Sequence, residues 1–456
     1  MSETESGVAE VRRPRRGRPP SVGLAERRRA ELTDAAFTVF AEQGYEQASV
    51  ADIARGAGMG QGTLYRYVEG KRELLDLVFD RCVDELMTAI APDEVVEVTA
   101  AGDPEAAQHM VEALGARLFD LVDARPDILK VVVVQAGTVD EELRFRIQGL
   151  YQTFDSMMGR ALGHARERGW IVTRTANPET ETVQLGRLLP ALGVPGLVMA
   201  LTGVEDLDRR RAYVRAALRL SGSGLLSDEA RAALPEPPRA DGTSTPPDGP
   251  PPAVVSSVVP GGRATELLDA AVAEFVENGY AAVGVREITE RAGVSHGTFY
   301  NYFDSKRHML SVLIERNREL TLGRLDAMVA ALPTALSAGE LQEAVHEVNL
   351  VVLLDIAHRR EEFRFLALEV PGVDVEAFDT YLALYGEAVA RYRAILERAR
   401  AAGLLHEELD IADVAEFWLG YMLGTVAAMV NDVDVASPAE SARVVTNLLL
   451  GGARTA

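Results

Sequence analysis

The feature that most constrains this chain is an internal repeat. Fifteen of the 36 positions from 40 to 75 recur unchanged from 275 to 310, at a constant offset of 235 residues and without a gap. Gly58 and Gly293 stand at the same place in the two copies. Self-similarity at a fixed offset indicates that one structural unit is present more than once. Any fold or function assigned to the chain must therefore account for two copies of that unit.

Composition limits the class of protein. The 456 residues suggest about two to four domains, and 47% hydrophobic residues suffice for packed cores. The single cysteine, Cys82, excludes a disulfide framework and is expected to be a buried structural thiol. The N-terminus lacks the apolar segment of a secretory signal, and the longest apolar runs are shorter than a membrane span. We therefore expect a cytoplasmic protein with no membrane partner.

Each copy of the repeat predicts a helix-turn-helix. A helix over Leu24–Gln43 is followed by Ser49, which with Asp52 three residues later forms a capping box. Gly58 supplies the left-handed conformation of a tight turn, and a third helix is expected over about Gln61–Val68. The second helix of such a pair can enter the major groove of DNA. The predicted motifs span Ser49 to Val68 and Gly284 to Phe303.

The remaining text is helical, and apolar runs with strand propensity have no neighbouring strand signals. The sequence therefore predicts an all-α fold of two tandem units, each with a helix-turn-helix domain and a helical regulatory domain. A Pro-rich linker separates them, since eight prolines lie within the eighteen residues from 235 to 252. The predicted segments are a basic arm (1–23), a first DNA-binding domain (24–80), a first regulatory domain (81–221), the linker (222–262), a second DNA-binding domain (263–315) and a second regulatory domain (316–456).

The N-terminal arm is strongly basic within an acidic chain. The net charge is -22, which argues against nonspecific nucleic-acid binding by the whole surface. The arm nevertheless concentrates arginines between prolines and glycines, and Arg16 and Arg18 flank Gly17 as in the core of an AT-hook. An extended arginine arm suits the narrow minor groove of A·T-rich DNA. The alternative is a disordered, solubilising tail.

The repeated pattern resembles the TetR family of bacterial transcriptional regulators. The residues that carry the resemblance are FAEQGY, SVADIARGAG and GTLYRYV followed by Lys71, and, in the second copy, AGVSHGTFYNYFDSK. The resemblance implies DNA-binding and ligand-responsive regulatory domains, and dimerisation through the last two helices. Family members are two separate chains, so the fused halves suggest an intramolecular pseudo-dimer, with a homodimer still possible.

The resemblance also assigns DNA contacts residue by residue. Backbone contacts are implied for Thr63, Tyr65, Tyr67, Lys71, Thr298, Tyr300, Tyr302 and Lys306. Because phosphate contacts position a protein and base contacts specify sequence, sequence readers are sought elsewhere: Gln61, Arg66, Arg286, His296 and Asn301. Gly62 and Gly297 would permit close approach to the DNA backbone, and Ser49 would start the helix before the turn. The first copy has Gly60, and the second has Gly284, where a capping side chain is usual.

Several alternatives remain open at this stage. The second copy could be a structural remnant that no longer binds DNA, in which case two chains would dimerise and use the first copy. A non-DNA helical interaction module is a second class. No nucleotide-binding, hydrolase or metalloprotease motif occurs in a suitable context, so we expect no enzyme, cofactor or metal site. An effector cavity could be lined by Gln135, Tyr151, Gln184, His346, Asn349, Tyr385 and Trp418, although such residues are more often core or interface residues.

We therefore expect a ligand-responsive repressor whose partners are an operator in double-stranded DNA and an unidentified small-molecule effector. The halves are expected to pack through Glu142–Arg168 and Glu179–Thr202 of the first unit against Glu376–Ala401 and Ala412–Asn431 of the second. Different readers in the two copies predict an asymmetric operator.

Overall fold

A computed structural model of the chain describes residues 22–45, 47–125, 128, 131, 141–175, 177–187, 207–234, 261–430 and 436–452. The named elements in these ranges are all helices. The described residues add an isolated antiparallel bridge between Leu226 and Leu405. The predicted all-α fold is therefore confirmed. The basic arm with Arg16 and Arg18, most of the linker, and residues 188–206 lie outside the described residues.

The chain forms two compact units, Met1–Val78 and Phe79–Ala456. The first contains the first helix-turn-helix and the beginning of the next helix. Its core is made by Leu32, Phe40, Ile53 and Leu64, all at 0% exposure. These are apolar positions at helical spacing, so amphipathic periodicity is sufficient to build it. Its helices are α1 (Val22–Gln43), α2 (Val50–Gly56), α3 (Gln61–Leu64) and the first part of α4 (Lys71–Ile90).

The larger unit begins with the remaining helices of the first half of the chain. Leu86, Met110 and Met157 belong to one apolar cluster, which α4, α5, α6 and α8 share. Cys82 is buried on α4, and burial raises the pKa of its thiol to about 12. The helices after α4 are α5 (Pro92–Ala101), α6 (Pro104–Ala124), α8 (Glu141–Glu167), α9 (Pro178–Leu185), α11 (Leu207–Ser223) and α12 (Asp228–Ala232).

The second helix-turn-helix belongs to the larger unit and shares a core with its regulatory helices. Phe275, on the helix that precedes the motif, stacks on Phe365, with ring centroids 5.1 Å apart. Leu366 and Val370 lie in the same apolar cluster. Shared packing of this kind couples the position of the motif to those helices. The helices of the second half are α13 (Arg263–Asn278), α14 (Val285–Arg291), α15 (His296–Tyr300), α16 (Lys306–Ala331), α17 (Ala338–His358), α18 (Arg360–Leu368), a 3-10 turn η2 (Val370–Gly372), α19 (Val375–Ala401), α20 (Ile411–Val430) and α21 (Pro438–Gly451).

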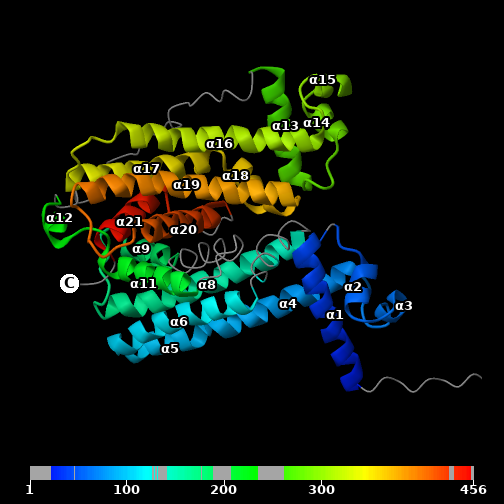
Figure 1. The fold of residues 1–456 in the computed structure, drawn as a ribbon, viewed down its shortest axis with the longest axis horizontal. Coiled ribbons are helices and arrows are strands. Elements are labelled where there is room, and N and C mark those ends of the chain that lie inside the picture. Colours follow the sequence, from blue (N-terminus) through cyan, green and yellow to red (C-terminus); the bar gives the residue numbers. More distant parts are fainter. Residues whose placement is uncertain are drawn as a thin grey trace, which may run out of the picture. The chain divides into compact units, whose positions relative to one another are not determined.

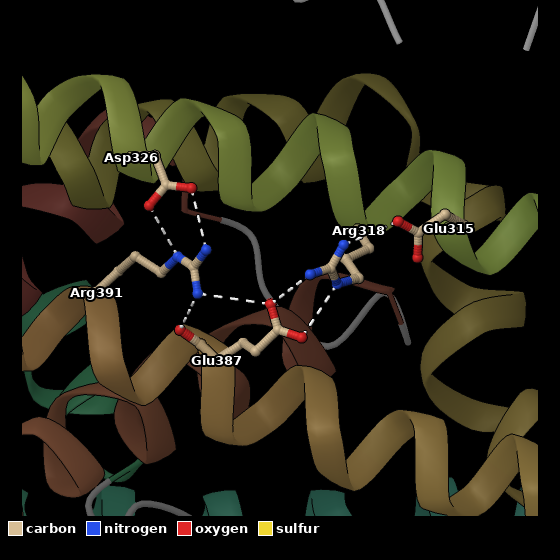
Figure 2. Close-up of polar contacts among 5 residues, drawn as sticks. All are labelled: Glu315, Arg318, Asp326, Glu387 and Arg391. Carbon is tan, nitrogen blue, oxygen red and sulfur yellow. Dashed lines mark hydrogen bonds and ion pairs between the residues drawn. The ribbon is translucent and has the colours of Figure 1, made fainter. Parts of the chain in front are cut away.

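Surface ion pairs hold α16 against α19 (Figure 2). Arg391 donates to both carboxylate oxygens of Asp326 at 3.0 Å, and Arg318 donates to both oxygens of Glu387 at 3.1 and 2.8 Å. Arg391 also lies 3.5 Å from Glu387, and Arg318 is bound to Glu315 on its own helix. Partly exposed pairs contribute only about 0.2–1 kcal/mol each, but the two-pronged geometry fixes the register of the two helices.

The largest core in the larger unit contains residues from both halves of the chain. Tyr213 and Leu220 of α11 are in the same apolar cluster as Trp418 and Tyr421 of α20 and Val445 of α21. Helix α9 packs on α21, and α11 packs on both α20 and α21 (Figure 1). The sequence interpretation placed these contacts on α8 and α19 instead of α11 and α21. The described contacts instead join α9 and α11 of the first half to α20 and α21 of the second.

The ordered part of the first half extends beyond the predicted start of the linker at residue 222. Leu225 N–H donates to Leu449 O at 2.8 Å, and Ser227 N–H donates to Leu404 O at 2.9 Å. Ser227 then caps the short helix α12. The linker was predicted to start at this point because Gly222 and Gly224 suggest the end of a helix. The bonds that order this segment come from residues about 180–220 positions away.

One described helix, α20, has the length and apolar composition of a membrane span. Its large side chains are nevertheless packed inside the protein, with Phe417 and Tyr421 at 1% exposure and Trp418 at 0%. The Trp418 ring meets that of Tyr392 edge-on at 4.5 Å. These contacts make α20 a core helix.

Candidate nucleic-acid interface

The two helix-turn-helix motifs have the same backbone turns. Gly44 and Gly279, which end the first helices, both have φ of 79°. Gly58 and Gly293, between the motif helices, both have φ of 65°. Positive φ in this range is readily available to glycine and strained for residues with a side chain. The turn predicted from the sequence is therefore present in both copies.

Apolar anchors hold the predicted recognition helices, α3 and α15, on their domains. Leu64 and Phe299 are fully buried at the equivalent position of the two helices, and Val68 and Phe303 are buried one turn later. The first recognition helix is shorter than predicted, since α3 ends at Leu64 and continues as turns. Burial of one face leaves the opposite face of each helix available to a ligand.

That outer face carries the predicted DNA contacts. The exposed residues of the first copy are Gln61, Gly62, Tyr65 and Arg66, and those of the second are His296, Gly297, Tyr300, Asn301 and Tyr302. Thr63, Tyr67 and Thr298 are half-buried. Tyr65 and Tyr300 each expose 51% of their surface, which is unusual for a large aromatic residue. The arrangement suits a surface that stacks on or bonds to another molecule.

The helix caps differ between the copies as the sequence suggested. Ser49 Oγ accepts the Asp52 N–H at 3.1 Å and starts α2. In the second copy Gly284 has no side chain for this purpose, but its own N–H donates to Glu287 at 2.9 Å. Ser295 Oγ accepts the Thr298 N–H at 3.2 Å and starts α15. The α3 cap, Gly60, provides no side-chain bond.

The two predicted phosphate lysines point their ammonium groups at backbone carbonyls. Lys306 Nζ donates to Tyr280 O and Val283 O, both at 2.7 Å, and lies 4.2 Å from the centre of the Tyr280 ring. Lys71 Nζ donates to Tyr45 O at 2.8 Å and lies 4.3 Å from the Tyr45 ring. Burial lowers the pKa of Lys306. Both lysines therefore hold the loop after the first helix against the start of the fourth, a role that the sequence interpretation did not assign.

Carboxylates hold the arginines of the second copy. Arg286, a predicted base reader, donates to Glu290 at 2.8 Å, and this bond raises its pKa. Arg291 on α14 bridges to Glu274 at 2.9 Å and to Glu277, both on α13. Within the described residues, Arg66 of the first copy has no carboxylate partner, and its guanidinium lies 5.9 Å from the centre of the Tyr67 ring. Arg66 is therefore the better placed of these cations to reach DNA.

Three of the polar residues considered for an effector cavity, Asn349, Tyr385 and Trp418, form hydrogen bonds to buried or half-buried neighbours. Trp418 Nε1–H donates to Asn349 Oδ1 at 2.8 Å, and Asn349 Nδ2–H donates to Thr446 at 3.1 Å. Tyr385 donates to Glu416, and burial raises the pKa of that carboxyl group. Asn349 and Trp418 form a satisfied buried network joining α17, α20 and α21, which makes them structural core residues.

Comparisons with known proteins bear on both motifs. The model of a family described as bacterial regulatory proteins, tetR family, matches residues 32–78 and 267–313. The Fatty acid metabolism regulator protein of Bacillus subtilis is 34% identical over 141 residues, which cover 31% of this chain and 69% of that protein. The HTH-type transcriptional repressor KstR2 of Rhodococcus jostii is 31% identical over 116 residues, 23% of this chain and 57% of its own length.

Among solved structures, the transcriptional regulator FadR from Bacillus subtilis in complex with stearoyl-CoA matches 41% of this chain and 98% of its own length. Its TM-score is 0.36 and its sequence identity is 24%.

Proposed function

Because the chain belongs to the TetR family of bacterial regulatory proteins, we propose that it is a transcriptional repressor that binds one operator as an intramolecular pseudo-dimer. Its two helix-turn-helix motifs would contact two unlike half-sites in double-stranded DNA. A small-molecule effector bound in the helical domains would release it by linkage. Operator DNA of a bacterium lies in the cytoplasm, where we place the protein.

The packing between halves is the observation that carries the proposal. Helix α9 of the first half packs on α21 of the second half, and α11 packs on both α20 and α21. Tyr421 OH donates to Gln184 O at 2.7 Å, and Arg209 forms an ion pair with Asp413 across the same boundary. Extensive burial of this kind is typical of permanent interfaces, and it supports one chain supplying both halves of a dimer.

The recognition faces support an asymmetric operator. Gln61 and Arg66 occupy the positions that His296 and Asn301 occupy in the second copy. Arginine favours guanine and asparagine favours adenine through two-pronged bonds in the major groove. We expect Arg66→Ala to cost about 1–3 kcal/mol of operator affinity and to relax the choice at one base pair.

Selection of sites from random DNA with the full-length protein tests the proposal. One chain per DNA molecule, measured by native mass spectrometry, and an asymmetric site would support it. Two chains on a perfect inverted repeat would favour the alternative, in which only the first motif reads DNA. The carboxylate partners of Arg286 and Arg291 favour that alternative, because they occupy cations of the second motif.

The effector class is open to a direct screen. The relative from Bacillus subtilis is a regulator of fatty acid metabolism by name, so fatty acids and their coenzyme A thioesters are the first compounds to test. Trp418 is fully buried beside Asn349, and its fluorescence would report rearrangement of the core. A compound that shifts this fluorescence and also lowers operator affinity would be an effector.

A further inference from the structure

Helices α11 and α21 meet through a reciprocal backbone contact. A side chain on Gly224 would begin 2.5 Å from Leu450 O and 2.6 Å from Gly452 N. A side chain on Gly452 would meet Gly222 O and, at 2.6 Å, Gly224 N. Residues 224 and 452 are 228 apart, as are 222 and 450. Reciprocity of this kind is what a two-fold axis produces between equivalent elements, so α11 and α21 are pseudo-symmetry mates.

Helices α9 and α20 correspond in the same way. Asn177 Oδ1 accepts the Thr180 N–H at 3.3 Å at the start of α9. Asp410 Oδ1 accepts the Asp413 N–H at 3.3 Å at the start of α20. Asn177 and Asp410 are 233 residues apart, and so are Thr180 and Asp413. The packing of α9 on α21 and of α11 on α20 is therefore one contact made twice.

The two versions of this contact differ in chemistry at their centre. On one side Gln184 Nε2–H donates to Ser441 Oγ at 2.9 Å, and the two residues are 1% and 0% exposed. The offsets place Phe417 (184 + 233) and Tyr213 (441 − 228) at the related positions. These are 1% and 0% exposed, within the shared apolar core. A bonded polar pair on one side thus corresponds to two aromatic residues on the other.

A second pair of positions differs in charge. Arg209 forms an ion pair with Asp413, whose side chain is only 4% exposed. The related positions are Ser437 (209 + 228) and Thr180 (413 − 233), which are neutral. The ion pair therefore occurs on one side of the pseudo-axis and has no counterpart on the other.

From these differences we infer that the surface selects unlike halves: a first half accepts a second half and rejects another copy of itself. The inference rests on the proposed pseudo-dimer and adds a rule for its pairing. Specificity of this kind comes from what the wrong pairing leaves unsatisfied as well as from what the right pairing gains.

If two second halves paired, both pairs of positions would be mismatched. Each mismatch would occur twice, once on each side of the two-fold axis. Asp413 would face Ser437 on each side, which leaves two buried carboxylates without their arginine. Phe417 would face Ser441, which removes the bond to Gln184 and leaves space where Tyr213 packs. A buried charge without its partner weakens association far more than the intact pair strengthens it.

Pairing of two first halves would fail for the complementary reason. Gln184 would face Tyr213 on each side, and neither the bond to Ser441 nor the aromatic counterpart would form. Arg209 would face Thr180 and lose its carboxylate. The unlike pairing is the one arrangement in which both sets of positions are matched.

Fragment exchange after cleavage of the folded chain tests the inference. A protease site inserted between Arg239 and Ala240 is cut in native buffer, the fragments are unfolded and refolded together, and native mass spectrometry counts the pairs. We expect unlike pairs to exceed like pairs by at least about tenfold. A statistical 1:2:1 mixture would overturn the inference. Fragments that separate on cleavage, before any unfolding, would instead refute the pseudo-dimer itself.

A designed variant should reverse the preference. Asp413→Thr together with Phe417→Gln gives α20 the residues of α9, so two second halves become mutually compatible. We expect paired second halves to increase about tenfold or more, whereas the exposed control Arg393→Gln with Glu397→Thr on α19 should change nothing. An unaltered distribution in the first variant would count against the pairing rule.

In the intact chain, the contribution of the Arg209–Asp413 ion pair to this packing can be measured without cleavage. Arg209→Asp should raise the unfolding equilibrium constant about a hundredfold, because two carboxylates then face each other. Adding Asp413→Arg should recover all but about tenfold of that loss. Strictly additive effects of the two substitutions would contradict the assigned contact.

Discussion

Replacement of Lys306 by methionine separates a structural role of this lysine from a DNA-contacting one. The ammonium group donates two bonds of 2.7 Å, to Tyr280 O and Val283 O, and lies over the Tyr280 ring. Methionine keeps the apolar stem and removes all three interactions. Bonds from a charged donor contribute about 1.5–3 kcal/mol each, and the ring contact contributes about 0.5–1 kcal/mol.

The net loss should be smaller than that sum. Lys306 is only half-buried, so water can replace part of the lost bonding, and the burial that lowers its pKa shows that the charge is incompletely solvated. We expect Lys306→Met to lower the local free energy of opening by about 2 kcal/mol. Lys71→Met should act in the same direction in the first motif. Hydrogen exchange measured on peptides covering 280–306 and 45–71 would report each local opening.

Operator binding supplies the decisive comparison. A lysine on a phosphate releases counterions, so its removal should reduce the slope of log K against log salt by about 0.9. We expect Lys306→Met to leave that slope unchanged. Unchanged hydrogen exchange combined with a reduced slope for Lys306→Met would refute the structural role and restore the phosphate contact.

Three further outcomes follow from the described contacts. Burial raises the pKa of Glu416, so this carboxyl group keeps its proton in the folded chain at pH values where it is ionised in the unfolded chain. The stability that Glu416 contributes is therefore lost as pH rises through its folded pKa, and Glu416→Gln should reduce the difference in Tm between pH 5 and pH 7. Ser49→Ala removes the acceptor of the Asp52 N–H and should lower protection of α2 against hydrogen exchange by about 1 kcal/mol. Trp418→Phe leaves Asn349 Oδ1 without its donor in a full core and should reduce the free energy of unfolding by about 2–4 kcal/mol in urea denaturation.

Local chemistry explains why the helix-turn-helix could be predicted from the sequence. Gly58 and Gly293 were assigned to turns because glycine tolerates positive φ, and both have it. Ser49 was assigned as a cap because its hydroxyl lies three residues before an amide that needs an acceptor, and it bonds that amide. Such features depend on neighbours within about one turn of helix, which the sequence displays directly.

The missed features depend on residues far apart in the chain. The family resemblance implied a phosphate contact for Lys306, whereas its ammonium group donates a hydrogen bond to the carbonyl of Tyr280, 26 positions earlier. The linker was predicted to begin at residue 222, whereas the Leu225 N–H donates a hydrogen bond to Leu449 O. Composition and periodicity carry no information about which distant carbonyl faces a given donor.

The packing of α9 and α11 on α20 and α21 within one chain has a genetic consequence. In a regulator built from two identical chains, each interface position is present twice, so it must be compatible with its own copy. In this chain the related residues Tyr213 and Ser441 are encoded by separate codons. Either residue can therefore be substituted without changing the other. If the chain acts as the proposed pseudo-dimer, a cell that carries an intact and a damaged gene forms no mixed dimers, and the damaged chain should not interfere with the intact one. Expression of an Arg66→Ala chain beside the normal chain, with repression of a reporter as the readout, would measure this independence.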